Sequence, residues 1–273
     1  MSVLVVIPAR YGSVRFPGKP LALLRGKPVI QHVYERLKTA SRASEVVVAT
    51  DDSRILEAVE RFGGRGVMTS PTAASGTERV AEVARARDAH VIINVQGDEP
   101  LVHPEMVDQL AGYLEQHAAV PMASLMTPLT RDDDARNPNI VKVVVDRDGF
   151  ALYFSRAPIP FIRHETRDMK PETTNGRPQP PPVSSLRSPV SYKHIGVYGY
   201  QRHFLLRFPT LSPTPLEQAE QLEQLRALEH GYRIKLLETA HDTVGVDTPE
   251  DLAKVEVLLQ RSDVRPDHHQ LKF

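Results

Sequence analysis

The stretch that decides the fold lies at the start of the chain, where residues 2–20 read SVLVVIPARYGSVRFPGKP. Residues 2–7 form an apolar run, which is typical of a strand buried on both faces of a parallel sheet. No charged residue precedes the run, and Pro8 and Arg10 follow it, so we interpret it as a strand and not as a signal peptide. The sequence therefore predicts a fold that begins with a buried strand.

A short cationic loop follows this strand. Arg10, Arg15 and Lys19 share the loop with Gly12 and Gly18, and in open α/β sheets ligands bind beyond the carboxyl ends of the strands. Glycines let backbone N–H groups approach phosphate oxygens, whose charge the cations neutralise. The loop matches neither a Walker A motif nor GxGxxG. It predicts a phosphate site, with a solvated basic loop as the alternative.

Apolar runs alternate with helical periodicities through the first half of the chain. This order predicts an α/β fold, an open, mostly parallel, twisted sheet with helices on both faces and right-handed crossovers. The further strands predicted there are 45–50, 66–68 and 90–95, and the helices are 29–40, 53–62, 76–87 and 104–116.

The second half has a different pattern. Residues 146–149 (DRDG) separate two apolar runs, which predicts a β-hairpin with its turn at Asp148 and Gly149. Residues 248–251 (TPED) have the composition of a helix start, with Thr248 as the N-cap residue. The predicted hairpin strands are 140–145 and 150–154, the other strands are 194–200 and 232–238, and the helices are 215–228 and 249–260.

A proline-rich segment interrupts this half. Residues 163–189 contain six prolines and an Asn-Gly pair, and we interpret them as an extended or disordered surface insert. A ligand for a partner's aromatic groove is the alternative. Residues 262–273 predict a frayed tail.

Composition and charge exclude several classes of protein. Hydrophobic residues make up 41% and charged residues 25%, as in a folded globular protein. Lys and Arg total 34, as do Asp and Glu, so the basic surplus of a nucleic-acid binder is missing. The lack of cysteine excludes disulfides, thiolate catalysis and sulfur-ligated zinc. No apolar run approaches the roughly 20 residues that span a bilayer. We therefore expect a cytoplasmic protein that binds neither nucleic acid nor membrane.

Two acidic residues predict a metal site. Asp98 lies in residues 94–100 (NVQGDEP), directly after a buried strand, and so at the same edge of the sheet as the cationic loop. A carboxylate there is well placed to hold Mg²⁺ against a triphosphate. Asp247 follows Gly245 on a later turn. Helix capping is the alternative for Asp98, Glu99 and Asp247, but the pair Asp98 and Asp247 predicts a two-carboxylate site.

Motifs along nearly the whole chain carry a resemblance to a known family. In order they are residues 8–21 (PARYGSVRFPGKPL), 75–79 (SGTER), 94–100 (NVQGDEP), 137–139 (NPN), 153–156 (YFSR), 194–200 (HIGVYGY), 215–217 (PLE), 222–226 (LEQLR) and 245–251 (GVDTPED). With these motifs the chain resembles the 3-deoxy-D-manno-octulosonate (Kdo) cytidylyltransferases, also called CMP-Kdo synthetases. The first loop is shared more loosely with other sugar nucleotidyltransferases. The later motifs, especially 154–156, 194–196 and 222–226, are much more specific to the Kdo enzymes.

This resemblance implies the reaction CTP + Kdo → CMP-Kdo + pyrophosphate, in the pathway to lipopolysaccharide. The sugar's 2-hydroxyl attacks the α-phosphorus in line, a step that needs positioning and charge neutralisation. By the family pattern Arg10, Arg15 and Lys19 hold the triphosphate, and Asp98 and Asp247 bind the cofactor Mg²⁺. The residues that face CTP are Ala9, Arg10, Ser13, Arg15, Lys19, Ser75, Gln96 and Asp98. The residues around the sugar are Arg79, Arg156, His194, Tyr198, Glu223 and Gln224.

The chemistry of the sugar residues leaves alternatives open. The planar fork of Arg156 matches the Kdo carboxylate, but Arg156 is also suited to a surface ion pair. His194 beside Ile195 is equally typical of a hydrogen-bonded core histidine. Glu223 and Gln224 suit sugar hydroxyls, but in the middle of a helix such residues are usually solvated.

The resemblance also implies a division of the chain and a homodimer. We expect a nucleotide-binding α/β core in residues 1–130 and a sugar-binding and dimerisation part, with the β-hairpin, in residues 131–240. Residues 241–261 return to the core with a metal ligand and the last helix. Two functions remain as alternatives: a cytidylyltransferase for another 2-keto sugar acid, such as an amino-Kdo or a sialic acid, and a non-catalytic CTP-binding regulator.

Overall fold

The computed structural model of the chain describes residues 2–13, 15–129, 131–161, 173–174, 177–178 and 191–263. The strands are β1 (Val3–Ala9), β2 (Leu23–Leu24), β3 (Lys27–Pro28), β4 (Glu45–Thr50), β5 (Gly66–Met68), β6 (Val91–Asn94), β7 (Met122–Pro128), β8 (Lys142–Val145), β9 (Ala151–Ser155), β10 (Thr173–Thr174), β11 (Arg177–Pro178), β12 (Tyr192–Gln201) and β13 (Ile234–Glu238). The α-helices are α1 (Val29–Leu37), α2 (Ser53–Arg61), α3 (Gly76–Arg85), α4 (Pro104–Gln116), α5 (Asp132–Arg136), α6 (Arg202–Arg207), α7 (Pro215–Glu220), α8 (Gln224–Glu229) and α9 (Pro249–Asp263), and the 3₁₀ turns are η1 (Lys19–Leu21) and η3 (Phe208–Thr210).

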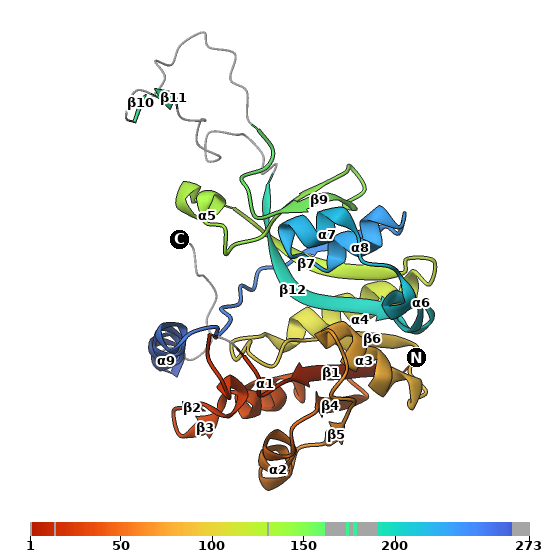
Figure 1. The fold of residues 1–273 in the computed structure, drawn as a ribbon, viewed down its shortest axis with the longest axis vertical. Coiled ribbons are helices and arrows are strands. Elements are labelled where there is room, and N and C mark those ends of the chain that lie inside the picture. The colour runs from red at the N-terminus through yellow and green to blue at the C-terminus, as the bar shows by residue number, and fades with distance from the viewer. Residues whose placement is uncertain are drawn as a thin grey trace.

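One large sheet organises this part of the chain (Figure 1). Its strands lie in the order β13-β7-β12-β6-β1-β4-β5, and β8 and β9 extend it from β12. β1 pairs in parallel with β4 and β6, and β13 pairs in parallel with β7, whereas β12 runs antiparallel to both β6 and β7. The predicted open, mostly parallel sheet is confirmed, with its antiparallel pairs confined to β12 and the β8–β9 hairpin.

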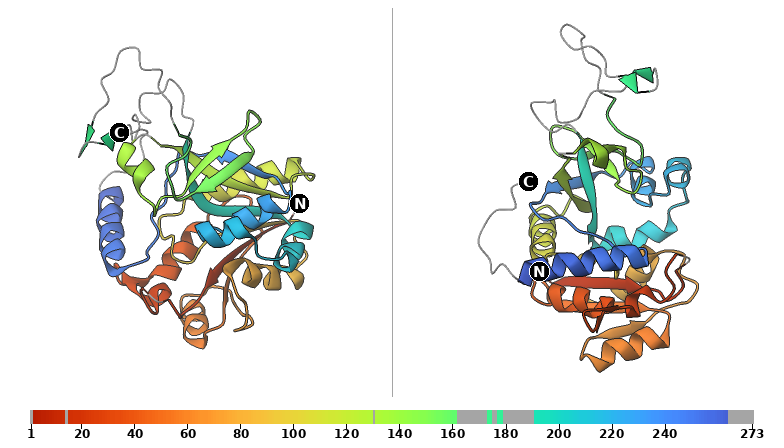
Figure 2. Two further views of the ribbon diagram at one scale, coloured as in Figure 1. Left: turned by 45° about the horizontal axis from the view of Figure 1, so that its top comes forward. Right: turned by 90° about the vertical axis from the view of Figure 1, so that its left-hand side faces the viewer.

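Helices cover both faces of the sheet (Figure 2), and the side chains of β1 show why. Val5 and Ile7 pack in the cluster that includes residues of α1 and α4, whereas Leu4 and Val6 pack in the cluster that includes residues of α3 and α6. Successive side chains of a strand point to opposite faces, so a strand covered on both sides needs a continuous apolar run. All seven residues of β1 are buried, as predicted.

The predicted helix over residues 215–228 is wrong. The structure has two short helices there, α7 and α8, because Gln221 adopts a left-handed conformation with φ 54°. The backbone N–H of Leu222 donates to the carbonyl of Glu217 at 3.2 Å, which closes α7 in the manner of a helix C-terminus. Glu223 and Gln224, which were predicted to lie around the sugar, follow this break directly, at the start of α8.

The predicted β-hairpin is confirmed as β8 and β9. The Asp146 carboxylate organises the turn: its Oδ1 accepts hydrogen bonds from the backbone N–H groups of Asp148 at 2.9 Å and Phe150 at 2.8 Å. Gly149 has a φ of 75°, a conformation that glycine adopts without a steric penalty.

Most other predicted elements exist, with shifted ends. The first strand reaches Ala9, the first helix ends at Leu37, and the last helix continues to Asp263. No prediction covers β7, whose sequence MASLMTP has Thr127 as its one β-branched residue, fewer than usually signal a strand.

The sheet crosses the expected division at residue 130. β12, which comes from the later part, lies between β6 and β7, which come from the earlier part. The division into domains stays a prediction. Apart from β10 and β11, the insert at 163–189 lies outside the described residues, as does most of the tail at 262–273. Among the helices that the structure describes, none has the length and apolarity to cross a bilayer.

Candidate active site

The cationic loop turns back on itself after β1. The backbone N–H of Gly18 donates to the carbonyl of Tyr11 at 2.9 Å, and Gly18 has a φ of 71°. A Cβ atom on Gly18 would also lie 3.0 Å from the Tyr11 ring, so this position requires glycine. The turn leads into η1, which begins with Lys19.

Lys19 lies between the two acids of the predicted metal site. Its Nζ donates to Asp98 Oδ2 and, at 3.0 Å, to Asp247 Oδ1. The Lys19 side chain is only 14% exposed. Burial alone would lower the pKa of Lys19, but the carboxylates of Asp98 and Asp247 outweigh burial and raise that pKa above its ordinary value. Lys19 is therefore a charged ammonium group held by two carboxylates.

The other loop residues are more exposed. Arg15 Nη2 lies 3.0 Å from Asp247 Oδ2, with 64% of the Arg15 side chain exposed. Arg10 is exposed directly after β1. Ser13 Oγ accepts a hydrogen bond from a backbone N–H later in the loop at 3.4 Å. The structure thus brings Arg15 and Lys19 to the aspartates and leaves Arg10 facing solvent at the start of the loop.

Asp247 lies on a segment that runs from the end of β13 to the end of β6. We call residues 239–247 the crossing segment. At one end the backbone N–H of Thr239 donates to the carbonyl of Met126 at 2.9 Å, and at the other that of Val246 donates to the carbonyl of Asp98 at 2.8 Å. β6, β7 and β13 point the same way, because β12 is antiparallel to both β6 and β7. The crossing segment therefore follows the carboxyl edge of the sheet.

Two further side chains hold the crossing segment. Lys193 of β12 pairs with Asp242 at 2.6 Å. Glu99 lies against this segment, and burial and then the neighbouring Asp98 carboxylate raise the pKa of Glu99 to about 7, although Thr243 acts to lower that pKa.

The capping role that was the alternative for Asp247 belongs to Thr248. The Thr248 hydroxyl oxygen accepts a hydrogen bond from the backbone N–H of Asp251 at 3.2 Å, as an N-cap residue does. Asp247 is thereby left to pair with Lys19 and Arg15.

Three residues predicted to face the nucleotide lie where β1, β6 and α3 meet. A Cβ atom on Gly97, just after β6, would lie 3.3 Å from Cβ of Ala9, and one on Gly76 would lie 3.7 Å from Oε1 of Gln96. Ser75 caps α3, because its Oγ accepts a backbone N–H at 3.2 Å. Ala9, Ser75 and Gln96 are therefore grouped around closely packed backbone.

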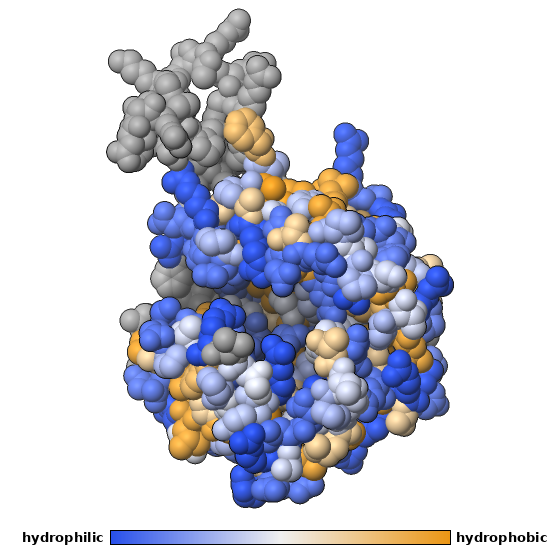
Figure 3. Space-filling model, viewed as in Figure 1, coloured by the Kyte–Doolittle hydropathy of each residue, from blue (hydrophilic) through white to orange (hydrophobic). Residues whose placement is uncertain are grey.

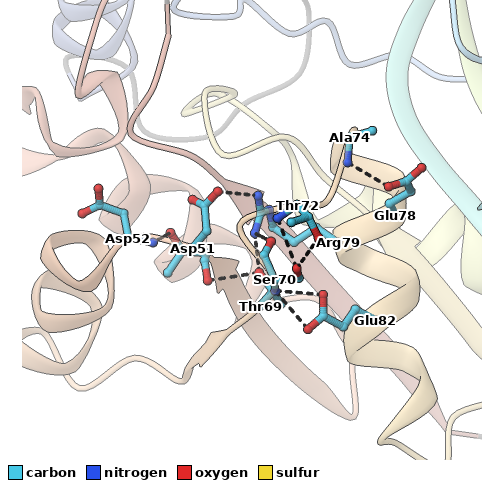
Figure 4. Close-up of polar contacts among 10 residues, drawn as sticks. Asp51, Asp52, Thr69, Ser70, Thr72, Ala74, Glu78, Arg79 and Glu82 are labelled. Carbon is cyan, nitrogen blue, oxygen red and sulfur yellow. Dashed lines mark hydrogen bonds and ion pairs between the residues drawn. The ribbon is translucent and has the colours of Figure 1, made fainter.

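Arg79 is engaged by protein groups from the segments that follow β4 and β5 (Figure 4). Its guanidinium pairs with Asp51 Oδ2 at 2.8 Å and donates to the hydroxyl of Thr69 and to the carbonyl of Ser70 at 3.3 Å. The Arg79 side chain is 5% exposed. Arg79 therefore ties α3 to the segments that follow β4 and β5, and its predicted contact with the sugar stays a prediction.

The break at Gln221 sets Glu223 against α3. The Thr77 hydroxyl donates to Glu223 Oε2. Glu223 Oε1, Gln224 Nε2 and Asn94 Nδ2 are buried and have no hydrogen-bond partner within the described residues. Buried polar atoms without partners are rare, and a polyhydroxylated ligand is a natural partner for them.

His194 and Tyr198 lie on one face of β12 beside this group. Their rings are 5.4 Å apart, and Phe154 packs edge-on against His194. His194 Nε2 lies 2.8 Å from the Ser124 hydroxyl, and burial lowers the pKa of His194 to about 3. Burial and the nearby Glu223 carboxylate raise the pKa of Tyr198 well above its ordinary value. His194 is thus a neutral, hydrogen-bonded core histidine at the border of the group.

Arg156 holds the break itself. Its Nε donates to the carbonyl of Glu220 at 2.9 Å and its Nη1 to that of Pro138 at 3.1 Å, while the Glu220 carboxylate accepts the Arg156 backbone N–H at 2.8 Å. A cation here also suits the carboxyl end of α7. The guanidinium of Arg156 thus donates to backbone carbonyls, while the Glu220 carboxylate binds the Arg156 backbone N–H. Burial acts to raise the pKa of Glu220, but hydrogen bonds, among them that from the Arg156 N–H, and the Arg156 charge lower that pKa below its ordinary value.

The elements that carry these groups border one hollow. Figure 3 shows the surface indented between the part that holds α7 and α8 and the part below it that holds α3.

Comparison with known proteins decides the family. A model of the cytidylyltransferase family matches residues 4–235. The chain belongs to the cytidylyltransferase family. It is 51% identical over 265 residues to a 3-deoxy-manno-octulosonate cytidylyltransferase of Geobacter metallireducens, covering 97% of this chain and 100% of that one. The corresponding protein of Geobacter sulfurreducens is 52% identical, with 93% and 98% covered.

A solved structure agrees with these relatives. This structure is that of a CMP:2-keto-3-deoxy-manno-octonic acid synthetase in complex with CTP, and it is 41% identical in sequence to this cytidylyltransferase. The two superimpose with a TM-score of 0.84, covering 96% of this chain and 100% of that chain. The cytidylyltransferase described here is accordingly a nucleotidyltransferase.

Four residues that no prediction named contact residues of the predicted site. Thr77 and Asn94 lie inside motifs that were recognised, but next to the residues chosen from them. Ser124 and Glu220 are visible only in three dimensions, since Ser124 belongs to the unpredicted β7 and Glu220 to the end of α7.

Proposed function

We propose that the chain transfers CMP from CTP to 3-deoxy-manno-octulosonate, giving CMP-Kdo and pyrophosphate. The observation that carries this proposal is the convergence of Lys19, Asp98 and Asp247, from three distant parts of the sequence, at the carboxyl edge of the sheet. Ligands bind at this edge in open α/β folds. The names of the relatives and the CTP-bound neighbour support the identity of both substrates.

Transfer of the CMP group requires the protein to position the substrates and to neutralise phosphate charge, more than to form a covalent intermediate. The 2-hydroxyl oxygen of the sugar forms a bond to the α-phosphorus of CTP and loses its proton, and the bond from that phosphorus to the β-phosphate oxygen breaks to release pyrophosphate. Lys19 is suited to the triphosphate because its ammonium group is already fixed in place, so little reorganisation is needed as charge moves to the leaving group. Arg15 adds a second cation, and Arg10 is placed to add a third.

Asp98 and Asp247 fit a Mg²⁺ site. Their oxygens converge on one cation, the ammonium group of Lys19, and hard carboxylate oxygen is the ligand that Mg²⁺ prefers. We propose that these two residues hold Mg²⁺, which neutralises and orients phosphate oxygens when bound. Lys19 offsets the repulsion between the two carboxylates.

The unpartnered polar atoms suit a sugar acid. Glu223 accepts hydrogen bonds from hydroxyl groups, while Gln224 and Asn94 donate them. We place the sugar between these residues and Tyr198, with His194 supporting the wall and Arg156 and Arg79 as further sugar contacts. Ala9, Ser13, Ser75 and Gln96 then face the nucleotide.

We also infer a homodimer that forms through the face with the β8–β9 hairpin. Among the described strands β9 pairs only with β8, and Leu152 on it is 63% exposed. Apolar residues gather at this end of the molecule in Figure 3, as a dimer interface requires. The family resemblance supports a cytoplasmic enzyme whose product enters lipopolysaccharide.

Pyrophosphate release tests the reaction. We expect turnover with CTP, Kdo and Mg²⁺, and none when the sugar or the metal ion is left out. UTP in place of CTP, and an amino-Kdo or a sialic acid in place of Kdo, test the choice of substrates. Faster turnover with one of those sugar acids would move the assignment to a different 2-keto sugar acid. Tight CTP binding in calorimetry without any turnover would instead indicate a regulator.

A further inference from the structure

A second group of metal-binding side chains lies outside the residues assigned to catalysis. His103, Glu105 and His241 offer three ligand atoms that lie within 4.8 Å of one another. Glu105 Oε2 is 2.7 Å from His241 Nε2 and 4.0 Å from His103 Nδ1. The two imidazole rings are stacked, with centroids 3.7 Å apart and planes 10° from parallel. Two parts of the sequence separated by more than a hundred residues are thus brought to one point.

The ligand set has a definite chemical character. Two imidazole nitrogens and one carboxylate oxygen suit divalent transition-metal ions of the zinc class, whereas Mg²⁺ and Ca²⁺ prefer sites made of oxygen alone. Zinc binds imidazole and carboxylate at about 2.0–2.2 Å, so neighbouring ligand atoms lie roughly 3.4 Å apart in a tetrahedral site. The observed spacings lie on both sides of this value. Because the two ring planes are nearly parallel, both rings must turn before their in-plane lone pairs point at one ion. His103 Nδ1 also exchanges the hydrogen bond that it accepts from the Glu105 backbone N–H, at 3.3 Å, for the metal ion.

The group is open to an ion from solvent. Exposed fractions of the side chains are 38% for His103, 66% for Glu105 and 27% for His241. In the present contact a proton joins His241 Nε2 to the Glu105 carboxylate, and a metal ion takes the place of that proton. With three protein ligands, a fourth position stays available to water, as in many zinc sites.

The three residues join two parts of the chain that lie close in sequence to the predicted metal ligands. His103 is the N-cap residue of α4 and comes five residues after Asp98, while His241 lies on the crossing segment, six residues before Asp247. We propose that His103, Glu105 and His241 form a binding site for a divalent transition-metal ion of the zinc class, which fastens the start of α4 to the crossing segment. This site is separate from the Asp98–Asp247 pair and does not depend on the proposed reaction.

Calorimetry with Zn²⁺ tests the site on the full-length chain. Saturating Mg²⁺ keeps the Asp98–Asp247 pair occupied, and no substrate is present. We expect one Zn²⁺ equivalent to bind, and His103→Ala or His241→Ala to weaken the binding by more than roughly 10-fold, since losses of 10- to 100-fold already follow from changing the partners of metal ligands. The exposed His203 provides the control, and His203→Ala should bind Zn²⁺ like the unaltered protein. Equal binding by all four proteins would place the ion elsewhere and overturn the proposal.

Two spectroscopic measurements make the test independent of a single variant. Co²⁺ in place of Zn²⁺ should give visible absorption bands typical of nitrogen ligation, and Glu105→Gln should change these bands while its thermal unfolding without metal stays near that of the unaltered chain. Hydrogen exchange should slow in residues 239–247 when Zn²⁺ is added. Bands that are unchanged in Glu105→Gln would show that Glu105 is not a ligand and would overturn the three-residue site. Exchange that is insensitive to Zn²⁺ would overturn the fastening role.

Discussion

The Nζ atom of Lys19 lies 3.0 Å from Oδ1 of Asp247, a residue 228 positions further along the chain. This contact joins the first loop of the fold to the crossing segment and closes the carboxyl edge of the sheet. Asp98 binds the same nitrogen, so the charges of Lys19, Asp98 and Asp247 are coupled.

Lys19→Ala should lower kcat by about 10²- to 10³-fold, the scale for loss of one preorganised electrostatic partner in a transition state. The ammonium group should matter most while pyrophosphate departs, so KM for CTP should change less than kcat. Steady-state pyrophosphate release measures both. Lys27→Ala is the matched control, because Lys27 forms an exposed pair with Glu35 at 2.8 Å. A kcat close to that of the unaltered enzyme would remove Lys19 from the reaction.

Asp98→Asn and Asp247→Asn should each nearly abolish activity, and their effects should not multiply. An amide keeps the shape but loses the charge that a hard cation prefers. Once the metal ion is lost, removal of the second ligand has little left to remove. The double variant should therefore be about as inactive as the worse single variant. kcat/KM across a Mg²⁺ titration measures this, with thermal unfolding as the control for folding. Multiplicative losses would mean that the two aspartates do not share a metal ion.

Glu223→Gln should raise KM for Kdo by roughly 10-fold or more and leave KM for CTP nearly unchanged. A hydrogen bond to a charged group is worth about 1.5–3 kcal/mol, and Glu223 Oε1 is one of the buried atoms that lack a partner. Glu238→Gln, at an exposed position, serves as the control. A rise in KM for CTP alone would assign Glu223 to the nucleotide.

Arg79→Met should destabilise the protein by about 3 kcal/mol, because removing one member of a buried pair leaves the other charge uncompensated. The Arg79 side chain is 5% exposed and that of Asp51 is 22% exposed, so the Asp51 carboxylate stays partly hydrated. The fall in the free energy of unfolding should therefore lie at the lower end of the range measured for buried ion pairs. Urea unfolding measures it. Unchanged stability together with a raised KM for Kdo would show that the guanidinium serves the sugar instead.

His194 should make the protein less stable in acid. Its pKa is lowered to about 3 in the folded state, whereas the unfolded chain binds a proton near pH 6.5. Below that pH the unfolded state binds more protons than the folded one, so the free energy of unfolding falls as the pH falls. Between pH 7 and pH 5 this residue should remove about 2 kcal/mol. His194→Gln should lose that part of the pH dependence, while His203→Gln, at an exposed position, should keep it. Equal slopes in both variants would contradict the burial argument.

The sequence predicted the structure correctly where a local pattern is compatible with a single arrangement. The apolar run of β1 required cover on both faces. The left-handed turn that requires glycine at position 18 is seen only in the structure. Asp98 was expected at the carboxyl edge because it follows a buried strand, and Asp247 was paired with it as an acid on a glycine-marked turn. The structure brings both to Lys19.

Other features depend on contacts that no local pattern reveals. The left-handed turn at Gln221 occurs at a residue that usually continues a helix. Arg156, just after β9, and Glu220, the last residue of α7, hold this turn. Arg79 was grouped with the sugar residues, yet its partners Asp51 and Thr69 come from two other segments. Strand β7 depends on β12 and β13, which both come later in the sequence.

The place of β12 between β6 and β7 has a consequence for how the protein is made. The two neighbours of β7 in the sheet, β12 and β13, are both synthesised after it. About seventy residues are made between the end of β7 and the completion of β12. During that interval the parallel strands β5, β4, β1 and β6 already exist, and β6 presents an open hydrogen-bonding edge. Such edges invite pairing with other chains. Chains that stop before residue 201 should therefore aggregate, whereas β12 seals the edge of those that continue.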